Sequence, residues 1–227
     1  MQRMKFRGYK LLFENRSAAE SMVRQIDEFP SFFTPEHDRP LIIDCGANIG
    51  VSVLEWKTRW PGAEIVCFEP DPFAFKILQA NIDVNDIPSV RCINAAVSRG
   101  DARGNSIDPA WGQREGTAQT RVKCKRLSSY IGDRDVSFLK LDIEGAEQRV
   151  LSEIAGQLDR VAAIYVEVHE TDDSNVYNSA DQIEQLLCDA GFHVEAESRF
   201  DEHALPAHLD AWKQSVGARQ VQLLGWR

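Results

Sequence analysis

An aspartate and an asparagine alternate with two glycines at one place in the chain, directly after an apolar run. Residues 41–43 read LII, and Asp44, Gly46, Asn48 and Gly50 follow at intervals of two. Glycine allows a tight turn and a close approach of the backbone to a ligand. A helix beginning near Asn48 would direct its free N–H groups and positive dipole end at that ligand. The pattern predicts a ligand site at the carboxyl end of a parallel strand.

The carboxylate of Asp44 restricts what that ligand can be. A dinucleotide-binding turn reads G-x-G-x-x-G, whereas this turn reads D-x-G-x-N-x-G and has Val53 in place of the third glycine. A carboxylate repels a pyrophosphate and attracts an ammonium or sulfonium group. S-adenosylmethionine carries both of these cations and no phosphate, so the pattern favours S-adenosylmethionine as the cofactor.

Two further strand ends supply candidate cofactor ligands. Glu69 ends the next apolar run, at the distance from the glycine turn where an acidic residue accepts hydrogen bonds from ribose hydroxyls. Asn94 and Ala95 stand in the third run, where small residues would leave room for adenine. In the alternative interpretation, Asp44 caps its own helix and Glu69 caps the next one.

A second group of ionisable residues surrounds the ends of the fourth and fifth predicted strands. In KLDIEGAE, Lys140, Asp142 and Glu144 alternate along the chain. In VEVHE, Glu167 and His169 share one face of a strand, because side chains in a strand alternate between its two faces. Both strands should adjoin the first one, so Asp142, Glu167 and His169 are expected to converge.

These residues suit methyl transfer, an in-line displacement that needs a closely positioned acceptor and a base for its proton. The ordinary pKa of histidine, ~6.5, makes His169 a candidate general base. Asp142 would share or replace that role, and Glu167 would orient the imidazole. Alternatively, Asp142, Glu167 and His169 bind a divalent metal that holds a sugar diol and lowers its hydroxyl pKa. In a purely structural interpretation, Lys140 pairs with Glu144 and His169 has no chemical role.

Apolar runs alternate with segments of helical periodicity along most of the chain. This alternation predicts a mostly parallel sheet covered by helices on both faces. The last two runs alternate polar and apolar residues and predict an antiparallel hairpin with a long connection. The predicted strands are residues 41–43, 64–69, 90–97, 119–127, 136–142, 162–168, 192–198 and 219–226. The predicted helices are residues 48–60, 72–84, 145–158 and 179–190.

Helix start signals accompany several of these segments. Asp71 and Pro72 suit the N-cap and the first position of a helix. Capping boxes that begin at Ser17 and at Ser179 predict two further helix starts. The apolar face predicted for the helix after Asp71 consists of Phe73, Ile77, Ala80 and Val84.

Residues 1–40 lie outside the alternating pattern and are predicted to form an N-terminal extension before the domain at 41–227. The apolar stripe of the helix after Ser17 indicates a helix packed on the sheet, with a lid over the site as the alternative. Residues 98–118 lack periodicity and predict a long loop. Side chains in and after this loop that would meet an acceptor, or form a solvated face, are Trp111, Arg114, Arg121, Lys123 and Lys125.

Composition excludes several classes of protein. The net charge of -9 over 227 residues disfavours a general nucleic-acid binder and docking to an anionic membrane. No apolar run approaches ~20 residues, so no transmembrane helix is expected, and the N-terminus lacks the features of a signal peptide. Five scattered cysteines without a C-x-x-C indicate free thiols in a reducing compartment, hence the cytoplasm. A homo-oligomer is compatible with the sequence.

The motifs together resemble the FkbM-type S-adenosylmethionine-dependent methyltransferases. The matching stretches lie within residues 41–170 and read IIDCGANIG, VCFEPDP, INAAVS, LKLDIEGAEQRVL and VEVHE. The resemblance implies an α/β fold of the Rossmann-like class I methyltransferase type, with a seven-stranded, mostly parallel sheet and an antiparallel last strand. It also implies methyl transfer to a hydroxyl oxygen of a small molecule or sugar. The implied cofactor contacts are Asp44, Gly46, Asn48, Gly50, Glu69, Asn94 and Ala95, with Asp142 near the transferable methyl group.

Two other function classes compete with this interpretation. An NAD-type oxidoreductase on a similar fold is disfavoured by Val53 and by the carboxylate of Asp44. A non-catalytic nucleotide-binding module would keep the fold without the chemistry, and the acidic residues and His169 argue against it. The identity of the acceptor does not follow from the sequence.

Overall fold

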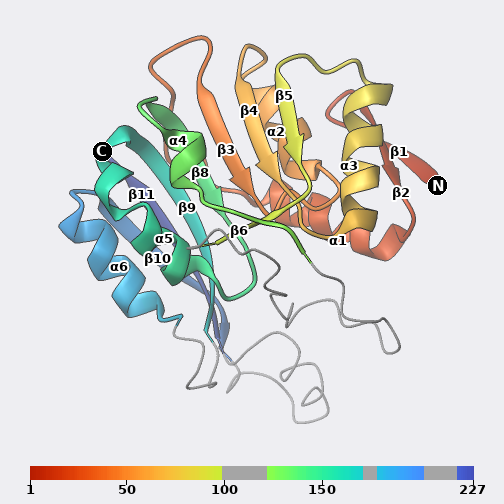
Figure 1. The fold of residues 1–227 in the computed structure, drawn as a ribbon. Coiled ribbons are helices and arrows are strands. Elements are labelled where there is room, and N and C mark those ends of the chain that lie inside the picture. The colour runs from red at the N-terminus through yellow and green to blue at the C-terminus, as the bar shows by residue number, and fades with distance from the viewer. Residues whose placement is uncertain (99–121, 171–177, 202–218) are drawn as a thin grey trace.

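The computed structural model describes residues 1–98, 122–170, 178–201 and 219–227. Its centre is a seven-stranded sheet in the order β10-β11-β9-β8-β3-β4-β5 (Figure 1). The strands of this sheet are β3 (Leu41–Cys45), β4 (Glu64–Phe68), β5 (Val90–Ile93), β8 (Val136–Leu141), β9 (Val161–Glu170), β10 (His193–Asp201) and β11 (Arg219–Trp226).

Strand direction divides the sheet into two parts. The strands from β9 to β5 pair in parallel, whereas β11 is antiparallel to both β9 and β10. These pairings confirm the predicted α/β class and the seven-stranded sheet with an antiparallel last strand. The predicted hairpin of β10 and β11 is confirmed, and its connection, residues 202–218, lies outside the described residues.

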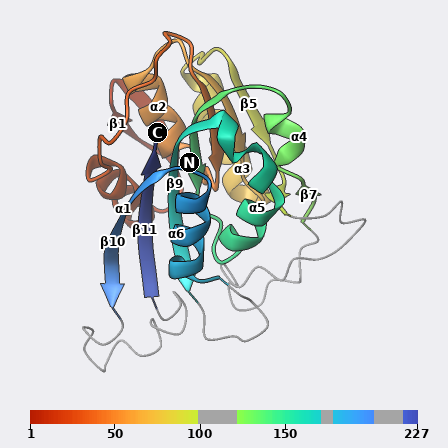
Figure 2. The same cartoon turned by 90° about the vertical axis from the view of Figure 1, so that its left-hand side faces the viewer.

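Helices cover both faces of the sheet (Figures 1 and 2). Ile43 of β3 enters the core on one face and Ile42 enters the core on the other, because successive side chains of a strand point in opposite directions. Burial on both faces explains why the central strands are continuous apolar runs. The first core contains residues of α4 (Ser128–Ile131), α5 (Glu147–Glu153) and α6 (Ala180–Asp189), and the second contains residues of α1 (Arg16–Asp27), α2 (Val51–Arg59) and α3 (Pro72–Val84).

The N-cap predicted for α3 is confirmed. Asp71 Oδ1 accepts hydrogen bonds from the backbone N–H groups of Phe73 and Ala74, and Pro72 occupies the first helical position. The carboxylate and the proline therefore fix where α3 begins, directly after the β4 end that carries Glu69.

Neither predicted capping box forms, although Ser179 is the N-cap residue of α6 as predicted. At α1 the cap is Asn15, whose Oδ1 accepts from the N–H of Ala18 at 3.1 Å, so the helix begins before Ser17. At α6, Ser179 makes no side-chain cap. The N–H of Ala180 donates instead to a carboxylate oxygen of Glu170 at 2.8 Å. In both helices a side chain other than the predicted serine accepts a hydrogen bond from a free backbone N–H of the first turn.

The apolar face predicted for α3 is wrong in part. Phe73 and Val84 are exposed, because the buried stripe of the helix turns toward the N-terminal hairpin. There the Asn81 side chain exchanges hydrogen bonds with the backbone N–H and carbonyl of Leu12. The buried residues of α3 are Ile77, Leu78, Asn81 and Ile82.

The strand predicted over 90–97 is interrupted. It forms β5 and a separate short strand, β6 (Ala96–Val97), which pairs in parallel with β7 (Cys124–Lys125). The interruption coincides with Asn94, whose amide nitrogen donates to the backbone carbonyls of residues 69 and 70. Within the described residues, β7 is also all that forms of the strand predicted over 119–127.

Two predicted helices are shorter than expected. The helix predicted from Asn48 begins at Val51, after a turn that the next subsection describes. The segment 145–158 is divided between α5 and a 3-10 helix, η1 (Ala155–Arg160). Among the described helices, none is long and apolar enough to cross a membrane.

Residues 1–40 form a β-hairpin and a helix beside the second core. The hairpin pairs β1 (Gln2–Phe6) with β2 (Tyr9–Phe13). In α1, Ala19 and Ile26 are buried in the core shared with α2 and α3, so the apolar stripe of α1 faces the protein. The division of the chain at residue 40 remains a prediction.

All five cysteines are free thiols, as expected. Their burial is less uniform than the sequence suggested, because Cys188 is exposed and Cys92 is partly exposed. Cys67 and Cys92 lie side by side on β4 and β5, with their sulfur atoms 3.6 Å apart.

Candidate functional site

Asp44 lies at the end of β3 and is completely buried. The indole Nε1 of Trp56, on α2, donates to Asp44 Oδ2 at 2.9 Å. The other oxygen, Oδ1, has no hydrogen-bond partner and lies 3.7 Å from Lys140 Nζ. Asp44 therefore does not cap α2, which excludes the alternative interpretation of this residue.

The turn after Asp44 is held in the left-handed backbone region. The φ angles of Gly46, Asn48 and Gly50 are 89°, 47° and 91°. A Cβ added at Gly46 would lie 1.8 Å from the backbone carbonyl oxygen of Asp142. Gly46 is therefore needed so that the turn can contact the end of β8. The sequence argument explained this glycine by the approach of a ligand and did not predict the contact with β8.

Glu69 lies at the end of β4 and joins three segments. Its carboxylate accepts hydrogen bonds from the backbone N–H groups of Asn48 and Asp71, both at 2.8 Å. The Asn94 side chain donates to the Glu69 carbonyl at 2.9 Å, and Ala95 is buried behind it. Burial raises the pKa of Glu69 to about 7, against the two backbone hydrogen bonds, which lower it. The predicted cofactor residues from β3, β4 and β5 are therefore adjacent.

Lys140 connects this group to the end of β8. Its Nζ lies 3.1 Å from Asp142 Oδ2 and donates to the Gly46 carbonyl at 3.3 Å. Burial by itself lowers the pKa of Lys140, but the charges of Asp142 and Asp44 outweigh it and raise the pKa above its ordinary value. The predicted ion pair between Lys140 and Glu144 is wrong, because Lys140 pairs with the two aspartates instead.

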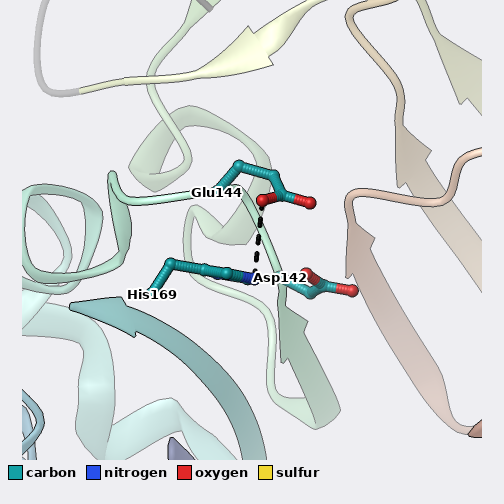
Figure 3. Close-up of side chains that lie close together, drawn as sticks. All are labelled: Asp142, Glu144 and His169. Atoms are coloured by element: carbon teal, nitrogen blue, oxygen red, sulfur yellow. Dashed lines mark ion pairs between the residues drawn. The ribbon is translucent and has the colours of Figure 1, made fainter. Parts of the chain in front are cut away.

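His169, at the end of β9, lies between the carboxylates of Glu144 and Glu147, and Figure 3 shows its contact with Glu144. Nε2 is 3.5 Å from Glu144 Oε2, and Nδ1 is 3.4 Å from Glu147 Oε1. Burial lowers the pKa of His169, but the hydrogen bond to Glu147 and the charges of Glu144, Glu147 and Asp142 raise it to about 10. The imidazole is therefore protonated at neutral pH, and the argument for a base with an ordinary histidine pKa does not hold here.

Glu144 is closer to the cluster than the sequence suggested. A ligand atom of Asp142, one of Glu144 and one of His169 all lie within 4.8 Å of one another. Glu144 has a φ of 58°, which turns the chain so that its side chain comes back toward His169. Partial burial raises the pKa of Glu144 to about 7, assisted by the charge of Asp142 and opposed by that of His169.

Glu167 is close enough to Asp142 and His169 to feel their charges, but its hydrogen-bond partner is Tyr165. The Tyr165 hydroxyl donates to Glu167 Oε2 at 2.8 Å, and Gln222 of β11 donates to the same hydroxyl. Burial and the charge of Asp142 raise the pKa of Glu167. Of the metal-binding set predicted from the sequence, Asp142 and His169 come together with Glu144 as possible ligands, and Glu167 is not in that group.

The sequence argument missed two residues that hold the site. Glu147 is fully buried, where it accepts from the N–H groups of Ile143 and Gly145 and from the Asn178 amide. Trp56 is fully buried, and a buried indole N–H needs an acceptor. That requirement is the signal that would have paired it with Asp44.

The structure describes two of the five side chains that were predicted to meet an acceptor or to form a solvated face. Lys123 and Lys125 are exposed, which agrees with a solvated face. The other members of that predicted group lie outside the described residues, as does most of the predicted loop at 98–118. They are Trp111, Arg114 and Arg121.

Acidic side chains thus gather where β3, β4, β8 and β9 end. Comparison with known proteins shows the family to which the chain belongs. The family model described as "Methyltransferase FkbM domain" matches residues 44–194. The chain belongs to the FkbM methyltransferase family. The match begins at Asp44 and includes every predicted site residue.

Two curated relatives of this FkbM-family chain are named methyltransferases. "Methyltransferase 1" of Beauveria bassiana is 31% identical over 147 residues, which cover 52% of this chain and 59% of the relative. The "31-O-demethyl-FK506 methyltransferase FkbM" of Streptomyces tacrolimicus is 27% identical over 197 residues, which cover 69% of this chain and 74% of the relative. The chain therefore spans little more than half the length of the first relative.

A solved structure of M. jannaschii TYW2 in complex with AdoMet resembles the fold. The TM-score is 0.52 at 13% sequence identity, over 98% of this chain and 84% of that chain. At this identity the likeness concerns the fold alone. The FkbM-family chain has the Rossmann-like fold of class I methyltransferases, as the resemblance implied.

Proposed function

We propose that this FkbM-family chain transfers the methyl group of S-adenosylmethionine to a hydroxyl oxygen of a small molecule or glycosyl acceptor. The observation that carries the proposal is the buried carboxylate of Asp44, whose Oδ1 has no hydrogen-bond partner at the tip of β3. Lys140 Nζ offsets the charge of this oxygen from 3.7 Å but makes no hydrogen bond to it, and a buried acceptor without a hydrogen-bond donor is costly. The ammonium group of the proposed cofactor would supply such a donor, whereas a pyrophosphate would not.

Glu69 fits the ribose of the same cofactor. Its two oxygens each accept one backbone N–H, from Asn48 and from Asp71. A carboxylate has about four lone-pair sites, so both oxygens retain acceptor capacity for ribose hydroxyls. Asn94, buried Ala95 and the turn at Gly46, Asn48 and Gly50 complete the proposed cofactor side. The TYW2 complex with AdoMet supports this choice by fold.

Asp142 occupies the boundary between cofactor side and acceptor side. Its side chain is 28% exposed, while Asp44 and Lys140 beside it are buried. When bound, S-adenosylmethionine supplies a methyl group on a positively charged sulfur and leaves as a neutral thioether. The reaction therefore needs no acid, and the chain must hold the acceptor hydroxyl and take its proton. We assign both tasks to Asp142, because its carboxylate is the partly exposed one of this group.

His169 and Glu167 complete the acceptor side in supporting roles. His169 contacts the carboxylates of Glu144 and Glu147. Its proposed role is to hold these two carboxylates in position near Asp142. Glu167 is fixed by Tyr165. The oxygen acceptor is supported by the name of the Streptomyces tacrolimicus relative, 31-O-demethyl-FK506 methyltransferase. We also propose a cytoplasmic location, which the free cysteines support.

Turnover with a panel of hydroxylated metabolites and labelled S-adenosylmethionine tests this function. We expect label in the ether fraction with the unmodified chain and loss of turnover with Asp142→Asn, at unchanged affinity for S-adenosylhomocysteine. Normal turnover of Asp142→Asn would remove Asp142 from the mechanism. Binding of S-adenosylhomocysteine without turnover on any acceptor would favour a non-catalytic nucleotide-binding module.

A further inference from the structure

Three side chains meet where β8 and β9 end, in an arrangement that suits a metal ion. Asp142 follows β8, Glu144 lies in the turn before α5, and His169 is on β9. Their ligand atoms lie within 4.8 Å of one another, and Figure 3 shows the three side chains gathered at one point. Carboxylate oxygens and an imidazole nitrogen are ligands that divalent metals take in proteins.

The second observation is how His169 is held from behind. Its residue exposure is only 5%, Nδ1 lies 3.4 Å from Glu147 Oε1, and Nε2 is directed at Glu144. Histidines that bind metals usually donate their other ring N–H to a carboxylate, which fixes the tautomer. Glu147 is outside the three-residue cluster and is itself fixed by Gly145 and Asn178. It is therefore placed to act as such a second carboxylate.

The balance of charge also favours a cation. The carboxylates around the imidazole are those of Asp142, Glu144, Glu147 and Glu167. The nearby ammonium is that of Lys140, which is 3.1 Å from Asp142 Oδ2. That pairing uses one oxygen of Asp142, so coordination through the other is compatible with it. Even with the imidazole protonated, as it is without a metal, four carboxylates face two cationic groups, and a divalent ion that displaces the imidazole proton would offset the remaining negative charge.

We propose that Asp142, Glu144 and His169 bind one divalent cation with open coordination positions facing the acceptor. This inference rests on the proposed methyl transfer and narrows its substrate class to compounds with two adjacent oxygens, such as a vicinal diol. Both oxygens would chelate the ion, and the hydroxyl that receives the methyl group would lose its proton more readily. Two of the three ligands are carboxylates, which suit Mn²⁺, and Mn²⁺ is paramagnetic, so it serves as the probe.

The test is a titration of the chelator-treated full chain with Mn²⁺ alone, followed by electron paramagnetic resonance. We expect one bound Mn²⁺ per chain and a loss of affinity of roughly tenfold or more for Glu144→Gln. Glu167→Gln is the matched control, because it removes a neighbouring charge without removing a ligand, and its affinity should stay within a few fold. Equal losses in the two variants, or no binding to the unmodified chain at millimolar Mn²⁺, would overturn the proposal.

A second measurement needs no variant. Electron spin-echo modulation of the bound Mn²⁺ should show coupling to a ¹⁴N nucleus, as expected for the imidazole of His169. Absence of that coupling would mean that His169 remains in an ion pair with Glu144 and that the metal site does not exist. S-adenosylhomocysteine binding is measured separately, so failure of the metal site and failure of the proposed methyl transfer are distinguishable.

Discussion

The Lys140 ammonium nitrogen lies 3.1 Å from Asp142 Oδ2 in the buried space where β3 and β8 end. The same nitrogen is 3.7 Å from the unpaired oxygen of Asp44. One lysine therefore connects the carboxylate assigned to the cofactor with the carboxylate assigned to the acceptor. Its positive charge lies near both carboxylates and offsets their mutual repulsion.

Replacing Lys140 should destabilise the fold strongly. Lys140→Met leaves two neighbouring carboxylates without their cation, and breaking a buried ion pair on one side costs about 3–5 kcal/mol. Lys57→Met is the matched control, because Lys57 is also buried but donates to the Ala63 carbonyl. Urea unfolding should show the larger loss for Lys140→Met. Equal losses would mean that the ion pairs contribute nothing beyond burial of the side chain.

Gly46→Ala should disrupt the contact between β3 and β8. Its new Cβ would overlap the Asp142 carbonyl, whereas a Cβ at Gly8, which has the same φ of 89°, meets nothing within 4 Å. The two substitutions share the backbone penalty and differ in the clash, so Gly46→Ala should cost about 1–3 kcal/mol more in unfolding free energy. A cost no greater than that of Gly8→Ala would show that the strand ends are not in contact.

The stability of the cofactor-free chain should depend on pH through Glu69. Its pKa rises from an ordinary 4.5 to about 7 on folding, so the folded state holds this proton more tightly. Its contribution is complete below pH 4.5 and is lost as the pH rises to 7, by on the order of 3 kcal/mol. Glu69→Gln should flatten that part of the profile measured by chemical unfolding. An unchanged slope in the variant would contradict the assigned pKa.

Asp44→Asn should weaken the cofactor site while preserving the fold. The amide oxygen can still accept the Trp56 indole N–H, but the amide nitrogen would then oppose an ammonium group. We expect affinity for S-adenosylhomocysteine to fall at least roughly tenfold by calorimetry, about 1.4 kcal/mol. Asp142→Asn, on the acceptor side, is the control and should keep its affinity. If the two variants lost the same affinity, the division into cofactor side and acceptor side would be incorrect.

The α/β class of the fold and the acidic residues at its strand ends could be predicted from the sequence, because alternating apolar runs and helical segments indicate them, and the family resemblance implied the seven-stranded sheet. Asp44, Glu69 and Asp142 indeed lie at adjacent strand ends. The pairing within the site could not be predicted, because it depends on side chains that meet only in three dimensions. Glu147 reaches His169 across 22 residues, and Trp56 reaches Asp44 from the following helix.

Predictions from neighbouring residues in the sequence were wrong where a side chain from elsewhere in the chain makes the expected contact instead. Ser179 is the N-cap residue of α6, as expected, but its side chain makes no capping hydrogen bond, and the Glu170 carboxylate accepts the Ala180 N–H instead. Glu167 was expected beside His169, yet the left-handed backbone at Glu144 brings Glu144 there instead. A single left-handed residue changes which carboxylate faces the imidazole, and nothing in the spacing of E-G-A-E reveals it.

Parallel calorimetric titrations of the purified chain with S-adenosylhomocysteine and with NAD test the central claim, that the carboxylate at the tip of β3 receives a cation and not a phosphate. The account predicts saturable binding of S-adenosylhomocysteine at one site per chain and no binding of NAD at the same concentrations. Saturable binding of NAD together with no binding of S-adenosylhomocysteine would contradict it.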